Sequence, residues 1–410
     1  MTPALTSHIR NSGHHRPPHG IGRPAAAADT LPVDFDPTEE QRAYYDSVVR
    51  FAGRELGGEG APGPAPFATA WRRCAEFGIQ GLAVPAAYGG SEAGALTIIL
   101  AMEALGLGCR DNGLLFSINA QMWACQHPLA RLGTEEQRRR YLPGLCAGSI
   151  VAAHALTEPG SGSDAFALAT TASPRGDGYV LNGTKTFVTN APVADLFLVF
   201  ATIDRSRGFG GVCAFLVERD DAGLSVGAPA RKMGLDSSPM GDVVLHDCLV
   251  PSARMLGAPG GGIGVFNAAM ERERSFILAS TLGTMQRDLD RCVGHARERR
   301  QFDQPIGRFQ AVSHRIVDMR LRLDTARLLL YRLGWLADQG RPIGLQSALV
   351  KLHLSECFLQ SSLDAVQIHG GYGYLSECQL EQDVRDAVAG RIYSGTSEVL
   401  RNLAARHMGL

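Results

Sequence analysis

One carboxylate in the segment Ala269–Ile277 falls where a helix would present its apolar side. Glu273 lies four residues after Ala269 and three before Phe276, so these three side chains share one face of a helix. Glu271 points to another face. A carboxylate held among apolar side chains loses hydration, which raises its pKa and makes it a better base. The alternative is a capped helix start with alternating, solvated charges; the spacing favours a base that removes a proton.

A second segment, Leu156–Asp164, combines glycines with hydroxyl groups. Its glycines let the backbone approach a planar ligand, and its hydroxyls can bond the heteroatoms of a ring. Most Gly-Ser loops are only polar turns, and that reading is the alternative here.

A third segment, Arg391–Glu398, places Ser394 immediately before a Gly-Thr pair. A hydroxyl group cannot take a proton from carbon as a carboxylate can. Ser394 is therefore no candidate for a base, unlike the carboxylate of Glu273.

The elements that must position these residues change type twice along the chain. Helical patterns fill residues 36–150, with capping sequences at Thr38–Gln41 and Gly133–Gln137. Residues 151–256 predict a β domain, because alternating β-branched runs are separated by Gly, Asp and Pro. Its strands are expected at 179–189, with an Asn-Gly turn inside, and at 196–201, 212–217 and 243–249. Helical periodicity then returns, and residues 257–410 predict a second helical domain.

The composition indicates two or three domains and no charged partner. A chain of 410 residues is too long for one simple core, and its formal net charge of −1 suggests neither nucleic acid nor an anionic membrane as a partner. No apolar run approaches the roughly 20 residues that a spanning helix needs. Nine cysteines occur without a CxxC pair or metal-ligand spacing, which predicts no metal site and a reducing cytoplasm.

Residues 1–35 differ from the rest of the chain. They contain four histidines and several prolines, and no acidic residue precedes Asp29. We expect a disordered tail. An organelle transit peptide is the alternative, since such segments are poor in acidic residues, but no helical apolar stripe is evident. Metal binding by the histidines is a third possibility, with no ordered segment to support it.

A series of motifs in chain order resembles the acyl-CoA dehydrogenase family, from about Asp36 to the end of the chain. The motifs are Leu156–Asp164, Asn182–Asn190, Arg297–Phe302, Val366–Gly373, Arg385-Asp386 and Ser394–Ser397. The resemblance implies an α+β fold with an N-terminal helical domain, a middle β domain and a C-terminal four-helix bundle. It also implies FAD as the cofactor and an acyl thioester, acyl-CoA, as the substrate.

The resemblance further implies which residues contact FAD. Four would meet the isoalloxazine ring: Thr157 and Ser163 at its edge, Phe187 on its face and Thr189 at its rim. Two would reach the pyrophosphate from the neighbouring subunit: Arg299 and Gln301. The others would lie along the rest of the cofactor: Phe302, Gln310, Gln367, Gly371, Thr396 and Glu398. A site shared in this way requires at least a dimer, and the family is usually a homotetramer.

The family gives a second reason to choose Glu273 as the base. Many members carry a glutamate before the Gly-Thr pair, where this chain has Ser394. The isovaleryl and long-chain branches are similar to this chain, because they place the base on the earlier helix just before an arginine, as in Glu273-Arg274. Glu273 would take the α-proton while the β-hydride passes to the flavin, and electron-transfer flavoprotein would reoxidise the enzyme. Substrate contacts would come from Ser163, Arg274 and Ser394, the last through its backbone N–H.

The segment Gly234–Asp242 departs from the family pattern, in which polar or basic groups often lie near CoA. Pro239, Met240 and Gly241 supply none of these. The acyl group could therefore arrive on the pantetheine of a carrier protein. Two further alternatives are a flavin oxidase or monooxygenase on the same fold, and a flavin-free relative that acts as an interaction protein.

Overall fold

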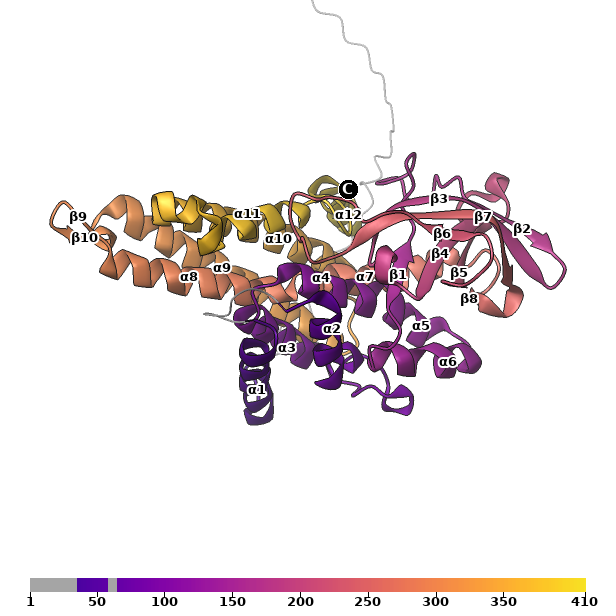
Figure 1. Cartoon of the computed structure of the whole chain (residues 1–410), viewed down its shortest axis with the longest axis horizontal. Helices are drawn as coiled ribbons and strands as arrows, with labels where there is room; N and C mark the ends of the chain where they lie inside the picture. The colour runs from indigo at the N-terminus through magenta and orange to yellow at the C-terminus, as the bar shows by residue number, and fades with distance from the viewer. Residues whose placement is uncertain (1–34, 58–64) are drawn as a thin grey trace, which may run out of the picture. The chain divides into compact units, whose positions relative to one another are not determined.

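Helices, then strands, then helices again follow one another in the computed structural model, which describes residues 35–57 and 65–410 (Figure 1). This order confirms the predicted α+β class. The tail predicted for residues 1–35 lies outside the described residues, apart from Phe35. The domain boundaries at residues 150 and 256 stay predictions.

Six α-helices form the N-terminal part: α1 (Glu39–Glu55), α2 (Phe67–Glu76), α3 (Ala95–Gly108), α4 (Asn112–Gln121), α5 (His127–Leu132) and α6 (Glu135–Cys146). Both capping sequences form complete capping boxes, at Thr38 with Gln41 and at Thr134 with Gln137. One π-helical turn, Met122–Gln126, lies between α4 and α5 within the segment predicted to be helical. Such turns are uncommon and are frequent at functional sites.

Eight strands form the middle sheet: β1 (Ala152–Ala155), β2 (Thr171–Arg175), β3 (Gly178–Thr189), β4 (Leu196–Thr202), β5 (Val212–Glu218), β6 (Leu224–Val226), β7 (Met240–Pro251) and β8 (Met255–Leu256). Their order is β6-β7-β3-β2-β4-β5-β8, with β1 parallel to β4. The long antiparallel pair of β3 and β7 carries residues that were predicted to meet the cofactor.

The Asn-Gly turn predicted inside residues 179–189 is wrong. β3 continues through Asn182 and Gly183, and the pairing with β7 shifts register at this point. Asn182 exchanges hydrogen bonds with Asp247 of β7, at 2.8 and 3.1 Å. Gly183, at φ +155°, therefore marks a β-bulge rather than a hairpin.

Six helices follow the sheet: α7 (Gly262–Phe276), α8 (Ala279–Glu298), α9 (Gln310–Asp338), α10 (Gly344–His369), α11 (Leu380–Ala389) and α12 (Ser397–His407). A two-stranded hairpin, β9 (Arg300–Gln301) with β10 (Gln304–Pro305), joins α8 to α9. Figure 1 shows this hairpin at the far end of the long helices, with the sheet at the opposite end of the molecule. None of the helices in the described residues is long and apolar enough to span a bilayer.

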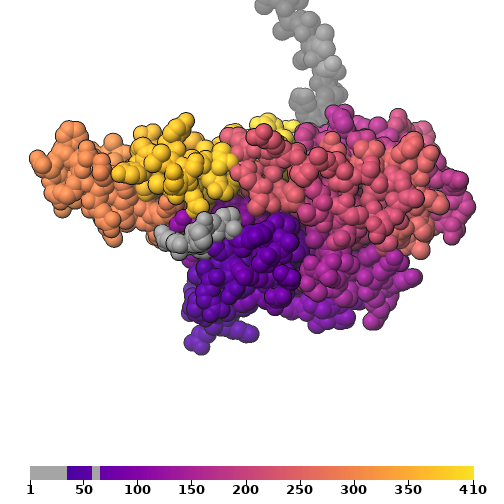
Figure 2. Space-filling view, viewed as in Figure 1, coloured from indigo at the N-terminus to yellow at the C-terminus, as the bar shows by residue number. Residues whose placement is uncertain are grey.

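The first and last groups of helices share one apolar core, and α7 lies where that core meets the sheet. Trp123 of the π-helical turn packs on Phe276 of α7, with ring centroids 4.7 Å apart. Nearer its start, α7 contributes Val265 to the apolar cluster beneath β4 and β5. Close approach of α3 and α8 requires glycine, because a Cβ on Gly283 would lie 2.0 Å from a carbonyl oxygen of Glu103. This packing fixes α7 between the helices and the sheet. Figure 2 shows the magenta and red residues of the middle part lying against both the indigo N-terminal helices and the yellow end of the chain.

Candidate active site

Glu273 lies on the buried side of α7 and is only 9% exposed. Ala269 and Phe276, the two apolar residues that defined its stripe, are buried beside it. Because α7 begins at Gly262, the segment around Glu271 is the end of this helix. The alternative of a capped helix start with solvated charges is therefore wrong.

The two carboxylate oxygens of Glu273 have different surroundings. The hydroxyl of Ser394 donates a hydrogen bond to Oε1. Oε2 is buried, and no group among the described residues bonds to it. Buried carboxylate oxygens are normally satisfied, so an orphaned one marks a place for a proton or a ligand group.

Burial raises the pKa of Glu273 above its ordinary value, and three neighbours oppose that rise. The hydrogen bond from Ser394 and the positive charges of Arg274 and Lys351 each favour the ionised carboxylate. A carboxylate with a raised pKa is a stronger base than one in water, and these neighbours let it lose its proton.

The segment Tyr393–Thr396 forms a tight turn against α7. Ser394 has φ +55°, a left-handed conformation that is uncommon for a residue with a side chain. Arg274 donates from Nε to the Ser394 carbonyl at 3.1 Å, and Lys351 donates from Nζ to the Gly395 carbonyl at 2.7 Å. Two cations thus hold consecutive peptide carbonyls and direct the Ser394 hydroxyl toward the base.

Thr396 and Glu398, predicted to contact the cofactor, lie at the start of α12. The Thr396 hydroxyl caps this helix by accepting from the Val399 N–H at 3.3 Å. Hydrogen bonds from its own backbone N–H and from Thr396 lower the pKa of the exposed Glu398 carboxyl. Their observed contacts are those of a helix cap, and the cofactor role stays a prediction.

Sequence reasoning missed several residues around the base. Phe116 of α4 packs on Tyr393, with ring centroids 4.6 Å apart. Cys125 of the π-helical turn feels the charge of Glu273, which adds to the effect of burial in raising the pKa of its thiol. Lys351 comes from α10. Cys125, Lys351 and Tyr393 thus lie close enough to Glu273 to feel its charge, and Phe116 packs behind Tyr393.

A second group of predicted residues lies on the sheet, around Phe187 of β3. This residue is 68% exposed, and its backbone has φ +57°, next to a shift in register between β3 and β7. The neighbouring Thr186 N–H donates to the carbonyl of Thr157 at 2.8 Å, which brings the Gly-Ser segment beside Phe187. Thr157 and Thr189 are half-buried, and Ser163 is exposed. An exposed aromatic ring with hydroxyl groups beside it fits a planar heteroaromatic ligand.

A buried ion pair supports this second group. Lys185 Nζ lies 2.7 Å from Glu158 Oε1, and both side chains are buried. Lys185 also donates to the carbonyl of Leu156 at 3.1 Å, while Glu158 accepts from the backbone N–H of Thr170 at 2.9 Å. Burial lowers the pKa of Lys185 to about 8, against the attraction of Glu158. The pair anchors the start of the Gly-Ser segment to β3.

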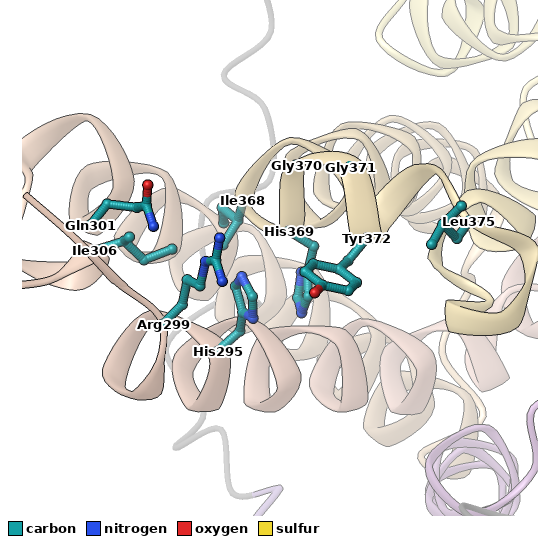
Figure 3. Close-up of a pocket in the computed structure, with 10 residues that line it drawn as sticks. All are labelled: His295, Arg299, Gln301, Ile306, Ile368, His369, Gly370, Gly371, Tyr372 and Leu375. Carbon is teal, nitrogen blue, oxygen red and sulfur yellow. The ribbon is translucent and has the colours of Figure 1, made fainter.

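A third group lies at the far end of the long helices, in a cleft of about 600 Å³ (Figure 3). Arg299, Gln301 and Gly371 line it, together with the stacked imidazoles of His295 and His369, whose ring centroids are 4.4 Å apart. The structure thus brings together Arg299 and Gln301, the two residues predicted to reach the pyrophosphate, with Gly371, which was predicted to contact another part of the cofactor. The exposed side chains of Phe302, Gln310 and Gln367 do not line this cleft. Glu273 and the Ser394 turn do not line it either.

The segment that departs from the family pattern is fastened to α11. Asp386 accepts from the Leu235 N–H at 2.5 Å, and Arg385 bonds Asp236 at 3.1 Å. The side chain of Lys232 points inward, donating to the Ser238 carbonyl at 2.7 Å. The Arg385-Asp386 motif therefore has a structural contact here, holding the loop between β6 and β7.

Comparisons with known proteins extend over all three parts of the chain. Family models of the acyl-CoA dehydrogenase N-terminal, middle and C-terminal domains match residues 38–149, 153–248 and 260–409. The L-prolyl-[peptidyl-carrier protein] dehydrogenase of Pseudomonas fluorescens is 43% identical, over 92% of this chain and 100% of that protein. The crystal structure of the prolyl acyl carrier protein oxidase AnaB has a TM-score of 0.88 and 43% identity, covering 92% of this chain and 100% of that one. The structure of PigA with FAD and proline has a TM-score of 0.88 and 38% identity, with the same coverage of each chain.

Proposed function

The chain belongs to the acyl-CoA dehydrogenase family, and on this premise we propose that it forms an α,β-double bond in an acyl group carried as a thioester by a carrier protein. Like other members of this family, it is an oxidoreductase that acts on a CH–CH group. The sequence favoured acyl-CoA as the substrate and kept the carrier protein as the alternative. The relatives named above support the alternative.

The observation that carries the proposal is the orphaned Oε2 of Glu273, a buried carboxylate oxygen directed at no group of the described residues. Removal of a weakly acidic α-proton needs a positioned carboxylate in surroundings that exclude water. Among the carboxylates that contact the Gly-Thr turn, Glu273 combines burial with an unoccupied oxygen. Glu356 bonds the residues on either side of this turn, Arg391 and Ser397, which hold its carboxylate.

The chain's own residues account for the handling of the proton. Glu273 receives the α-proton on Oε2, while Ser394 keeps Oε1 fixed through its hydroxyl. Arg274 and Lys351 balance the negative charge of the base before it is protonated. FAD, when bound, supplies the acceptor for the β-hydride. One electron pair of the broken C–H bonds leaves with the hydride and the other forms the new C=C bond, so the product is an α,β-unsaturated thioester.

The residues that would hold FAD form two separate groups in one chain. The isoalloxazine ring would lie on the sheet, held by Thr157, Ser163, Phe187 and Thr189. The cleft with Arg299, Gln301 and Gly371 would hold the phosphates, since a guanidinium offers a fixed positive charge and directed donors. The remaining contacts with FAD would come from Phe302, Gln310, Gln367, Thr396 and Glu398.

Two incomplete groups in one chain support an oligomer in which neighbouring subunits share each cofactor. α9 offers a surface for such contact, because Val317, Leu321 and Leu328 are exposed on it at helical spacing. Homodimer and homotetramer both fit this arrangement, and the family favours the tetramer.

An L-prolyl thioester is the first substrate to test. It has an α C–H beside the thioester carbonyl and a β-methylene in its ring, so the same proton and hydride can leave. Cys125 and Tyr393 lie close enough to Glu273 to feel its charge, and Phe116 packs on Tyr393. Bulky groups this near the base suit a compact acyl group better than a long chain. The segment with Pro239 and Met240 offers no basic group for a nucleotide of CoA.

Anaerobic bleaching of the flavin absorbance tests the proposal. The purified protein is mixed with L-prolyl-carrier protein, L-prolyl-CoA, butyryl-CoA and isovaleryl-CoA, each at equal concentration. The proposal predicts fastest bleaching with the carrier-bound prolyl thioester. Faster bleaching with the acyl-CoA thioesters would return the assignment to acyl-CoA.

A second candidate function is that of an oxidase, which differs from a dehydrogenase in the oxidant that accepts the electrons. AnaB is named an oxidase, so molecular oxygen is an alternative to electron-transfer flavoprotein. An oxidase makes one hydrogen peroxide for each double bond formed in air, because oxygen takes the two electrons and two protons. A dehydrogenase turns over with an artificial acceptor and releases little peroxide.

A further inference from the structure

Lys351 of α10 is one of only three lysines in a chain that has 40 lysine and arginine residues. Its side chain is completely buried, at 0% exposed. Burying an ammonium group is unfavourable unless hydrogen bonds or an opposite charge compensate. In a chain that uses arginine at nearly every cationic position, a buried lysine indicates a place for a compact point charge rather than a planar fork.

The contacts of Lys351 all lead to the turn that touches the base. Nζ donates to the carbonyl of Gly395 at 2.7 Å and lies 5.5 Å from the centre of the Tyr393 ring. Among the residues that the structure describes, no carboxylate forms a direct ion pair with it. Glu273 is the strongest of the charges that act on it, ahead of Arg274.

The turn needs this support because of its backbone conformation. Ser394 has φ +55°, and a residue with a side chain keeps this left-handed conformation only where its surroundings hold it, whereas Gly395 adopts φ +98° freely. Arg274 bonds the first carbonyl and Lys351 the second. Loss of either donor frees one end of the peptide that directs the Ser394 hydroxyl at Glu273.

We propose that Lys351 is a positioning residue for the base, which fixes the Ser394–Gly395 turn through its hydrogen bond and keeps Glu273 ionised through its charge. Lys351 touches neither the substrate nor the cofactor in this role. The inference rests on the proposed role of Glu273 as the base.

The electrostatics of the cluster agree with this arrangement. Burial lowers the pKa of Lys351 to about 7, and Glu273 opposes that change. The remaining charged groups that act on Lys351 are Arg274 of α7, Glu356 of α10 and Glu398 of α12. Cys125 and Tyr393 also feel the charge of Glu273, and burial raises the pKa of both. Because Lys351 and Glu273 stabilise each other's charged forms, removing one must shift the titration of the other.

Three lysines make that reciprocal shift directly measurable. The FAD-bound protein labelled with ¹³C-lysine gives three side-chain signals, which Lys→Arg variants assign. In Glu273→Gln the midpoint of Lys351 should fall by about one pH unit, since an opposite charge has been removed. Lys185, which pairs with Glu158, and Lys232, which bonds the Ser238 carbonyl, should keep their midpoints and serve as internal controls.

An unmoved Lys351 midpoint in Glu273→Gln overturns the proposal. This measurement needs no substrate, so it stays decisive even if the thioester assay fails. FAD absorbance and the unfolding midpoint show that the isosteric variant is folded.

The effect on the base is read from the pH profile of kcat/KM. Lys351→Gln keeps a donor for the Gly395 carbonyl but removes the charge, whereas Lys351→Arg keeps the charge. The acid limb should move up by about one pH unit in the Gln variant and less in the Arg variant. Equal rates and limbs in wild type and Lys351→Gln overturn the electrostatic role.

Discussion

Ser394→Ala should raise the pKa of Glu273 and thereby move the acid limb of kcat/KM to higher pH. The Ser394 hydroxyl bonds the charged carboxylate, and this bond is one of the factors that lower the pKa of Glu273 against the effect of burial. A hydrogen bond to a charged group contributes about 1.5–3 kcal/mol. Since one pKa unit corresponds to about 1.4 kcal/mol, the limb should rise by about one to two pH units.

Because the acid limb moves upward, the loss of activity in Ser394→Ala must be measured at low pH. At a pH below the acid limbs of both the wild type and Ser394→Ala, the ionised fraction of Glu273 falls about tenfold for each pH unit by which the limb rises. The variant should therefore lose roughly 10- to 100-fold in kcat/KM there. Well above both limbs Glu273 is ionised in each protein, and the difference should shrink. A matched control is Ser397→Ala, which removes a hydroxyl three residues away that bonds Glu356 at 2.9 Å. The reasoning is refuted if the two variants have the same acid limb, or if Ser394→Ala lowers it.

Three further predictions concern the groups that would hold the cofactor. Lys185→Met strands a buried carboxylate, so denaturant unfolding should show a loss of about 3–5 kcal/mol; a loss below 1 kcal/mol would contradict the ion pair's structural role. Phe187→Ala removes an exposed ring, so the free energy of unfolding should change by no more than about 0.5 kcal/mol while FAD dissociates roughly tenfold more readily. Phe209→Ala, which removes another exposed ring, is the control. Equal FAD retention in both variants would argue against a ring site at Phe187. Mixed oligomers of Glu273→Gln and Arg299→Ala subunits should regain activity that neither homomer has, because some sites combine an intact base with an intact guanidinium; no recovery in mixed oligomers would contradict a shared site.

The sequence predicted the parts of the fold that depend on local pattern. Capping sequences at Thr38 and Thr134 begin helices as expected, because a side chain that satisfies free backbone N–H groups acts within one turn. The Asn-Gly pair at Asn182 shows where local pattern fails. Pairing of β3 with β7 along its length determines that the chain continues as one strand, and hydrogen bonds between Asn182 and Asp247 accompany the bulge.

The site was predictable where one helix contains the signal. Glu273 was found from its apolar stripe, and the same test applied to α10 would have found Lys351, whose neighbours on that face include Ala348, Leu354 and Ser355, all buried. The hydrogen bond from Ser394 could not be predicted, because it joins residues 121 positions apart in the chain. The motifs also did not show how the predicted cofactor residues divide in space. In one chain some lie on the sheet and others line the cleft at the far end of the long helices.

The most direct test of the central claim is the rate of flavin reduction in Glu273→Gln, measured by rapid mixing without oxygen and with the thioester that reduces the wild-type protein fastest. The amide keeps the shape of the side chain but cannot accept the α-proton. General-base catalysis contributes about 10²–10⁴ in rate, so reduction should slow by at least 100-fold while FAD content and thioester binding stay near wild type. Reduction within tenfold of the wild-type rate would contradict the account, because another group would then have to remove the proton.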